Sequence, residues 1–307
     1  MTQVCISEVG PRDGLQSIST IMPTDHKVRW IELEHAAGVR EIEVGSFVSP
    51  KLLPQMADTA EVVKRVSHLN DLTVAVLIPN LRGCEAAIEA GADKISIPLS
   101  VSETHSIKNV RRDHAAMIEE IAACLRLVES IEASARPQFE VGLSTAFGCT
   151  IEGQIDESKV INLARIVLDL GVAEVGLSDT TGMGNPVQLE RLVTGIWAAC
   201  GSDRLTGVHL HNTRGQGLAN VLKAVELGIT TIDSSLGGLG GCPFAPGASG
   251  NIVTEDLVFL LESMGYDTGI DIDRLISVRK EVAGLLSNEE WFGFLSDAGL
   301  PLGWTPQ

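Results

Sequence analysis

The sequence predicts an α/β fold, namely a (β/α)8 TIM barrel with C-terminal capping helices. Short runs rich in Val and Ile alternate eight times with amphipathic segments, which predicts a parallel sheet surrounded by helices. The length of 307 residues accommodates the about 250 residues that such a barrel requires. Several helical segments stop at a glycine, which readily adopts the left-handed conformation that ends a helix: Gly38, Gly91, Gly171 and Gly228.

An open, doubly wound sheet is the competing architecture. That fold usually has fewer units, and a Gly-rich phosphate-binding loop follows its first strand. Here the first strand is followed by GPRDG at Gly10–Gly14, which lacks the glycine spacing of that loop. The closed barrel is therefore favoured.

The elements follow one another without a linker or low-complexity segment. The expected strands are residues 4–9, 40–44, 72–78, 94–98, 139–144, 174–178, 207–211 and 231–236. The expected helices are residues 25–37, 57–67, 84–90, 112–133, 157–170, 187–199, 216–226 and 251–264. We expect one domain over residues 1–307, with the barrel at about 1–265 and a helical cap at about 266–307.

The expected cap contains a cluster of aromatic residues. Its segment from about residue 269 to 307 predicts one or two helices. We expect the aromatic side chains to pack against the barrel or a neighbouring subunit. They are Trp291, Phe292, Phe294 and Trp304. A homo-oligomer, a dimer or higher, is the expected assembly.

The composition excludes several classes of function. A net charge of −17 argues against nucleic acid and anionic membrane surfaces, because both attract basic surfaces. No segment has 18 consecutive apolar residues, and the N-terminus does not resemble a signal peptide. The six cysteines form no close pair in the sequence. Reduced thiols and a cytoplasmic location are the expectation.

Reactive side chains at the carboxyl ends of the strands indicate where the site lies, because TIM barrels carry their active sites there. His209 and His211 stand two residues apart at the end of the seventh strand, so both imidazoles can face one point. A single histidine is usually an ordinary polar residue. Two with this spacing at a barrel mouth favour a metal site.

Carboxylates stand at three other strand ends. Asp13 follows the first strand and is either a metal ligand or a turn residue, since Asp-Gly is typical of turns. Arg12 beside it either pairs with Asp13 or directs a cation at a developing oxyanion. Glu43 ends the second strand and Asp179 follows the sixth. Each could be a structural ion-pair partner, but groups at the catalytic mouth more often support the site.

A Gly-rich run follows the eighth strand, from Gly237 to Asn251, and contains Cys242. It is either a flexible surface loop or a segment that folds over a ligand. Asn251 either caps the last helix or offers its amide oxygen to a metal. Two imidazoles, a carboxylate and an amide oxygen lack the thiolates of a structural zinc site. This set suits Mg²⁺ or Mn²⁺ with open positions for substrate.

Long motifs in the chain resemble those of the 3-hydroxy-3-methylglutaryl-CoA lyase family. The run EVGPRDGLQ from Glu8 to Gln16 resembles the opening signature of that family. SFVSPK at 46–51 and PQM at 54–56 resemble its second-strand segment, and residues 237–256 resemble its Cys-bearing loop. The resemblance extends to roughly residue 270.

The resemblance implies a set of site residues. The metal ligands of the family fall on Asp13, His209, His211 and Asn251. Catalytic roles fall on Arg12, Cys242, His209, Glu43 and Asp179. Gln16, Lys51 and Asn80 are expected as cofactor-binding residues. Cys242 and His209 stay as alternatives for the group that moves protons.

The resemblance also implies the reaction. It is a metal-dependent retro-Claisen cleavage of an acyl-CoA, in which 3-hydroxy-3-methylglutaryl-CoA gives acetyl-CoA and acetoacetate. Two positions depart from the family pattern, because Gly142 replaces a Tyr and His105 replaces a Phe near the acyl group. The departures leave citramalyl-CoA, which would give acetyl-CoA and pyruvate, as an alternative substrate.

Two further functions are less favoured. A condensing acyltransferase of the same superfamily generally carries a long regulatory region that 307 residues cannot hold. A non-catalytic binding protein would be expected to have lost metal ligands, yet all four positions hold competent residues.

Overall fold

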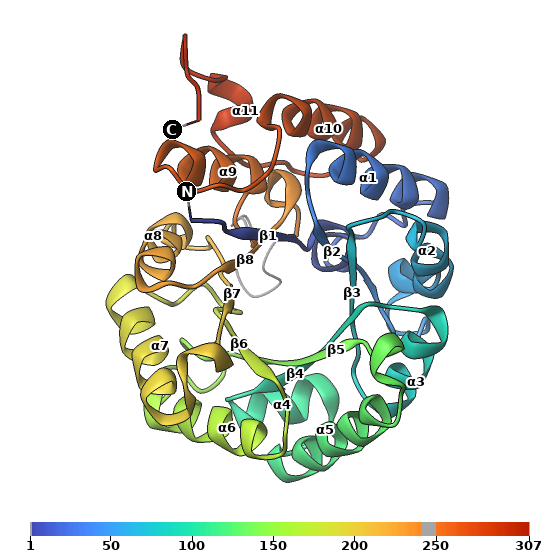
Figure 1. The fold of residues 1–307 in the computed structure, drawn as a ribbon, viewed down its shortest axis with the longest axis vertical. Helices are drawn as coiled ribbons and strands as arrows, with labels where there is room; N and C mark the ends of the chain where they lie inside the picture. Colours follow the sequence, from blue (N-terminus) through green and yellow to red (C-terminus); the bar gives the residue numbers. More distant parts are fainter. Residues whose placement is uncertain (1, 241–249, 307) are drawn as a thin grey trace.

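The computed structural model describes residues 2–240 and 250–306. Its eight parallel strands form a closed barrel in sequence order, β1 to β8, with helices around the outside (Figure 1). This confirms the predicted fold class. The strands are β1 Cys5–Glu8, β2 Glu41–Ser46, β3 Thr73–Leu77, β4 Lys94–Ser100, β5 Gln138–Ser144, β6 Glu174–Ser178, β7 Gly207–His209 and β8 Thr231–Ser234.

The helices agree closely with the expected segments. They are α1 Thr24–Ala37, α2 Thr59–Val66, α3 Leu81–Ala90, α4 Glu103–Val110, α5 His114–Glu129, α6 Glu157–Asp169, α7 Pro186–Cys200, α8 Gly217–Leu227, α9 Thr254–Ser263, α10 Ile272–Leu285 and α11 Leu295–Ala298. The predicted glycine stops are confirmed, because all four glycines have a positive φ, between 87° and 110°. Only glycine adopts this conformation without a steric penalty.

Two expectations about the elements were wrong. Helix α4 was missed, although Ser102 begins it by accepting a hydrogen bond from the His105 N–H at 3.1 Å. Its eight residues are too few for a clear helical periodicity. The last barrel helix was predicted to start at Asn251 but starts at Thr254, so Asn251 is not its N-cap. Asn251 instead forms an isolated antiparallel bridge with His211.

The apolar core lies between the strands and the surrounding helices. Strand β4 illustrates this alternation. Its residues Ile95, Ile97 and Leu99 face the helices and are fully buried. The alternate residues Lys94 and Ser96 are polar and hydrogen-bond to residues of other strands inside the barrel. The barrel interior is therefore polar, whereas TIM barrels usually fill this space with branched apolar side chains.

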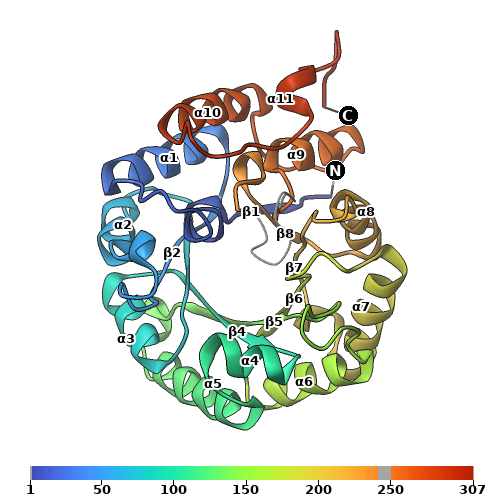
Figure 2. The same ribbon diagram turned by 180° about the vertical axis from the view of Figure 1, so that it is seen from behind.

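The C-terminal segment packs outside the ring of helices. Helix α10 lies beside α1, and α11 lies beside α9 (Figures 1 and 2). Trp304 contacts Phe259 with ring centroids 5.6 Å apart, and Arg279 lies over the ring of Trp291. These tryptophans pack against the chain itself, whereas Phe294 is 80% exposed. None of the helices in the described residues is long and apolar enough to cross a membrane.

Candidate metal centre

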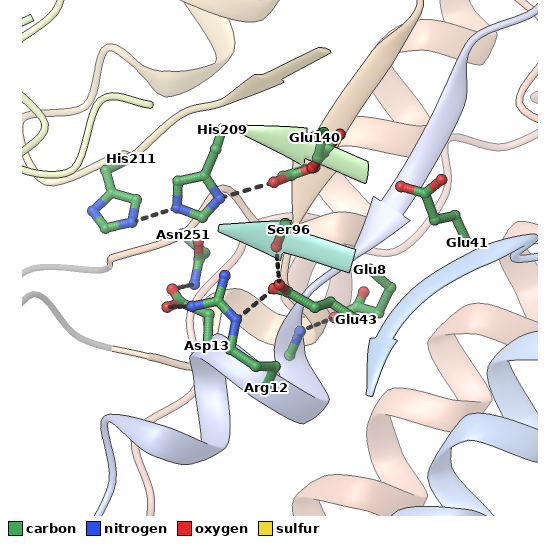
Figure 3. Close-up of polar contacts among 12 residues, drawn as sticks. Glu8, Arg12, Asp13, Glu41, Glu43, Ser96, Glu140, His209, His211 and Asn251 are labelled. Atoms are coloured by element: carbon green, nitrogen blue, oxygen red, sulfur yellow. Dashed lines mark hydrogen bonds and ion pairs between the residues drawn. The ribbon is translucent and has the colours of Figure 1, made fainter. Parts of the chain in front are cut away.

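Three of the predicted metal ligands meet at the carboxyl end of the barrel. Asp13 lies in the helical turn Gly10–Gly14 that follows β1, and His209 is the last residue of β7. His211 follows two residues later. One ligand atom from each of these three residues lies within 4.8 Å of the others (Figure 3). The i, i+2 spacing of the histidines therefore brings both rings to one point, as predicted.

The two imidazoles face each other through nitrogen. Nε2 of His209 lies 3.0 Å from Nε2 of His211. Nδ1 of His209 lies 3.1 Å from the Asp233 carboxylate on β8. Because a carboxylate only accepts hydrogen bonds, this contact assigns the proton of a neutral His209 to Nδ1. The lone pair on Nε2 is then directed at the space shared with His211, as metal binding requires.

Asp13 is held by several partners. Its carboxylate accepts hydrogen bonds from Arg12 at 2.5 Å, from Gln16 at 3.0 Å and from Asn251 at 2.8 Å. Burial alone would raise the pKa of Asp13, but the charge of Arg12 and the nearby His209 hold it well below its ordinary value. Asp13 is therefore a carboxylate at neutral pH.

His211 is suited to bind a cation as a neutral ring. Burial and the neighbouring His209 lower the pKa of His211 to about 3, so its ring is neutral and one of its two nitrogens carries a lone pair that can bind a metal. For His209, burial opposes protonation, but the hydrogen bond from Nδ1 to Asp233 raises its pKa overall. One carboxylate and two imidazoles, with the Asn251 amide alongside, fit a divalent cation that prefers N and O ligands.

Arg12 lies between two carboxylates. Its Nε donates to Glu43 and its Nη1 to Asp13, and Glu43 also accepts from Ser96 at 3.2 Å. Arg12 is 8% exposed and Glu43 is 6% exposed. Burial alone would lower the pKa of Arg12, but Glu43 and Asp13 raise it, so the guanidinium stays charged. Among the described residues, nothing hydrogen-bonds to Nη2 of Arg12.

The remaining predicted site residues lie in different surroundings. Asp179 is 1% exposed and accepts the backbone N–H groups of Met183 and Gly184, both at 2.9 Å. Its carboxylate thus fixes the turn after β6. Asn80 caps α3 by accepting from the Gly83 N–H at 3.0 Å. Gln16 contacts Asp13, as described above.

The roles predicted for two residues, Lys51 and Cys242, are not tested by any contact in the structure. Lys51 is exposed and forms no hydrogen bond or ion pair with any residue that the structure describes. Cys242 lies outside the described residues. The roles assigned to both stay predictions from the sequence.

Sequence reasoning missed Asp233 and Glu8. Asp233 pairs in register with His209, so its side chain meets the imidazole on the adjacent strand. Glu8 is fully buried and accepts hydrogen bonds from the N–H groups of Gly10 and Leu236 and from the Thr254 hydroxyl at 2.8, 2.9 and 2.6 Å. It therefore ties the turn bearing Asp13 to the segments on either side of Asn251. In the sequence, each of these residues is recognisable as an acidic residue within a predicted strand, which is the pattern that could have identified it as part of the site.

Comparison with known proteins adds to this geometry. The family model described as HMGL-like matches residues 3–282. The chain belongs to this family. Mitochondrial hydroxymethylglutaryl-CoA lyase of Macaca fascicularis is 41% identical over 287 residues, covering 94% of this chain and 87% of that protein. Hydroxymethylglutaryl-CoA lyase YngG of Bacillus subtilis is 38% identical over 278 residues, covering 91% of each.

Solved structures of this family have the same fold. An HMG-CoA lyase from Acinetobacter baumannii, in complex with coenzyme A and 3-methylmalate, has a TM-score of 0.91 and 41% identity. The alignment covers 99% of this chain and 98% of that one. The resemblance stated from the motifs is therefore confirmed at the level of the family.

Proposed function

We propose that this chain is a divalent-metal-dependent carbon–carbon lyase that cleaves 3-hydroxy-3-methylglutaryl-CoA, or a close relative, to acetyl-CoA and acetoacetate. One observation supports this most strongly. Asp13, His209 and His211 converge beside the buried cation of Arg12 in a chain of the HMGL-like family. Such a site can bind the oxygens of a 3-hydroxyacyl thioester and stabilise the negative charge that bond cleavage develops.

Asp13, His209, His211 and Asn251 would hold the cation, for which we propose Mg²⁺ or Mn²⁺. A bound divalent cation supplies a Lewis acid and a template for the substrate oxygens. The Asn251 amide now donates to Asp13 through Nδ2, and its Oδ1 is the atom it can offer a cation. Asp233 keeps Nε2 of His209 available by accepting from Nδ1.

Arg12 would stabilise the enolate. Glu43 and Asp13 fix the guanidinium through Nε and Nη1, which leaves Nη2 as a donor for the thioester oxygen. A donor held in place before the reaction lowers the barrier more than a mobile one, because no reorganisation is needed as charge develops. The ion pair with Glu43 thus serves a positioning role.

The proton on the C3 hydroxyl must leave as the carbon–carbon bond breaks. Both ring nitrogens of His209 already have partners, Asp233 at Nδ1 and His211 at Nε2. This arrangement favours Cys242 over His209 as the group that moves protons. The expectations of a homo-oligomer and a cytoplasmic location are carried forward as part of the proposal.

Citramalyl-CoA is the second candidate substrate. The Acinetobacter baumannii relative was solved with coenzyme A and 3-methylmalate, a hydroxy diacid with a four-carbon backbone. A diacid of that length corresponds to the acyl part of a malyl-type thioester more closely than to a glutaryl one. Both esters keep the 3-hydroxyacyl thioester on which the proposed reaction depends.

The test is a panel of 3-hydroxyacyl-CoA esters, including both candidates, with purified enzyme, Mg²⁺ and acetyl-CoA release as the readout. We expect release from 3-hydroxy-3-methylglutaryl-CoA, and loss of that release on chelation. A His211→Ala preparation, purified in the same way, controls for a contaminating lyase. Release from citramalyl-CoA alone would replace the first substrate with the second, and no release from any ester would refute the lyase proposal.

A further inference from the structure

A small cavity lies inside the barrel next to the metal centre. It has a volume of about 60 Å³ and is lined by residues of β4 to β8 and by Thr206. Three of the lining residues are glycines on adjacent strands, namely Gly142, Gly176 and Gly207. Gly142 pairs with Gly176, and Gly176 pairs with Gly207, so the three form one row across the barrel wall.

The backbone does not require glycine at these positions. None of the three has the positive φ that other residues avoid. A Cβ built on Gly142, Gly176 or Gly207 would lie no closer than 3.9, 3.8 or 3.7 Å to its nearest neighbour, which is ordinary contact. Glycine inside a strand is less stabilising than alanine. The row therefore lowers stability, and what it provides is space.

The cavity adjoins the metal centre on one side and charged groups on the other. His209 and Asp233 line the side toward the site, one layer above the glycine row. Lys94, Glu140 and Glu174 line the opposite side. Lys94 is already neutralised, since Glu41 and Glu140 lie 3.1 and 3.0 Å from its Nζ. The far side of the cavity therefore has no free cation and repels an anion.

We propose that this cavity receives a neutral C3 substituent, larger than methyl, of the acyl-CoA substrate; the inference rests on the proposed function. Coenzyme A is too large for the barrel interior, so the thioester enters from the mouth with its acyl end deepest. A C3 substituent directed inward then reaches the glycine row, while the substrate carboxylate stays near Arg12 and the cation.

The size and chemistry of the cavity define the substituent. Measured with a water-sized sphere, about 10–15 Å³ is enough to hold one water molecule, so the cavity has room for a group of a few atoms. An ethyl group or a hydroxymethyl group meets this limit. A carboxylate does not suit the cavity, because Glu140, Glu174 and Asp233 line it. The favoured substrate class is a 3-hydroxyacyl-CoA with a two- or three-atom neutral group at C3.

The experiment compares 3-hydroxy-3-methylglutaryl-CoA with its 3-ethyl homologue in the Mg²⁺-loaded enzyme. The measured quantity is the ratio of kcat/KM for the ethyl ester to that for the methyl ester. We expect a ratio near or above one in the unaltered chain. Gly176→Ala and Gly142→Ala put a methyl group into the cavity and should lower the ratio about tenfold or more.

The control is Gly284→Ala on α10, where a Cβ would meet nothing within 4 Å and the ratio should not change. Because the cavity accepts a Cβ at Gly142 and Gly176, both variants should fold, with Tm equal to or above that of the unaltered chain. Cleavage of the methyl ester without the ethyl ester overturns the inference alone. An unchanged ratio in both glycine variants does so too. If neither ester releases acetyl-CoA, the proposed function fails and the inference fails with it.

Discussion

Arg12 donates a hydrogen bond from Nε to the carboxylate of Glu43, and both side chains are buried beside the candidate metal centre (Figure 3). Nη1 of the same guanidinium donates to Asp13 at 2.5 Å. Two carboxylates therefore hold one planar group in a fixed direction. The two alternatives that the sequence left for Arg12 are therefore compatible, because pairing with Asp13 does not use all its donors.

The first prediction is that Arg12→Lys lowers kcat by about 10²-fold or more. Lysine keeps the charge and has three donors, but it lacks the planar fork, so contacts with Glu43 and Asp13 would not hold a further donor in the same fixed direction toward the substrate. Steady-state kinetics with acetyl-CoA release measures the effect. Arg29→Lys is the matched control, because Arg29 forms an ion pair on the exposed surface. Its Nε lies 3.1 Å from the Glu281 carboxylate. A near-normal kcat in a folded Arg12→Lys enzyme would refute the catalytic role.

Much of this site follows from local patterns in the sequence. The spacing of His209 and His211 places both rings on one side of β7, and parallel strands bring their carboxyl ends to one rim. Asp13 could be assigned to the same rim for that reason. These rules require only the position of a residue within its own strand, and the structure bears them out at all three positions.

Other features depend on contacts between distant segments. Asp233 meets His209 only because β7 and β8 pair in a particular register, and Glu43 meets Arg12 across 31 positions of sequence. The glycine row of the cavity depends likewise on the registers of β5, β6 and β7. A periodicity within one strand does not contain that information.

The second prediction concerns metal affinity. His211→Ala removes a ligand and should abolish stoichiometric Mn²⁺ binding. Asp233→Asn leaves every ligand in place but removes the charge that orients His209, so we expect Mn²⁺ affinity to fall about 10–100-fold. Titration calorimetry measures both effects without substrate. Asp203→Asn, at an exposed position, is the control. Unchanged affinity in Asp233→Asn would show that Asp233 does not support the site.

The third prediction concerns Cys242. A thiol that moves protons should be alkylated readily in the free enzyme and protected by a substrate analogue. The five other cysteines compete poorly, since Cys84, Cys124 and Cys149 are buried. Burial raises the pKa of Cys5 to about 12 and also raises that of Cys200, so few thiolates form there. Mass spectrometry after brief labelling identifies the site. Equal labelling of Cys242 with and without the analogue would remove it from the site.

The last prediction concerns stability and pH, through the ion-paired group Glu140. Burial raises the pKa of Glu140 to about 7 from an ordinary value of 4.5; Lys94 opposes this shift, while Glu41 and Asp233 add to it. Between pH 4.5 and about pH 7, Glu140 holds a proton in the folded chain that it has already released in the unfolded chain. The free energy of unfolding therefore falls as pH rises through this interval.

Glu140→Gln removes this titration, because Gln stays neutral at every pH. Relative to the variant, the unaltered chain should lose up to about 3 kcal/mol of stability between pH 4.5 and 7, in proportion to the pKa shift. Urea unfolding of both proteins at half-unit steps of pH measures the difference. A stability difference that stays constant across this interval would show that the pKa of Glu140 is near its ordinary value. Lys94 would then neutralise a Glu140 carboxylate that stays charged throughout this range, because its Nζ lies 3.0 Å away.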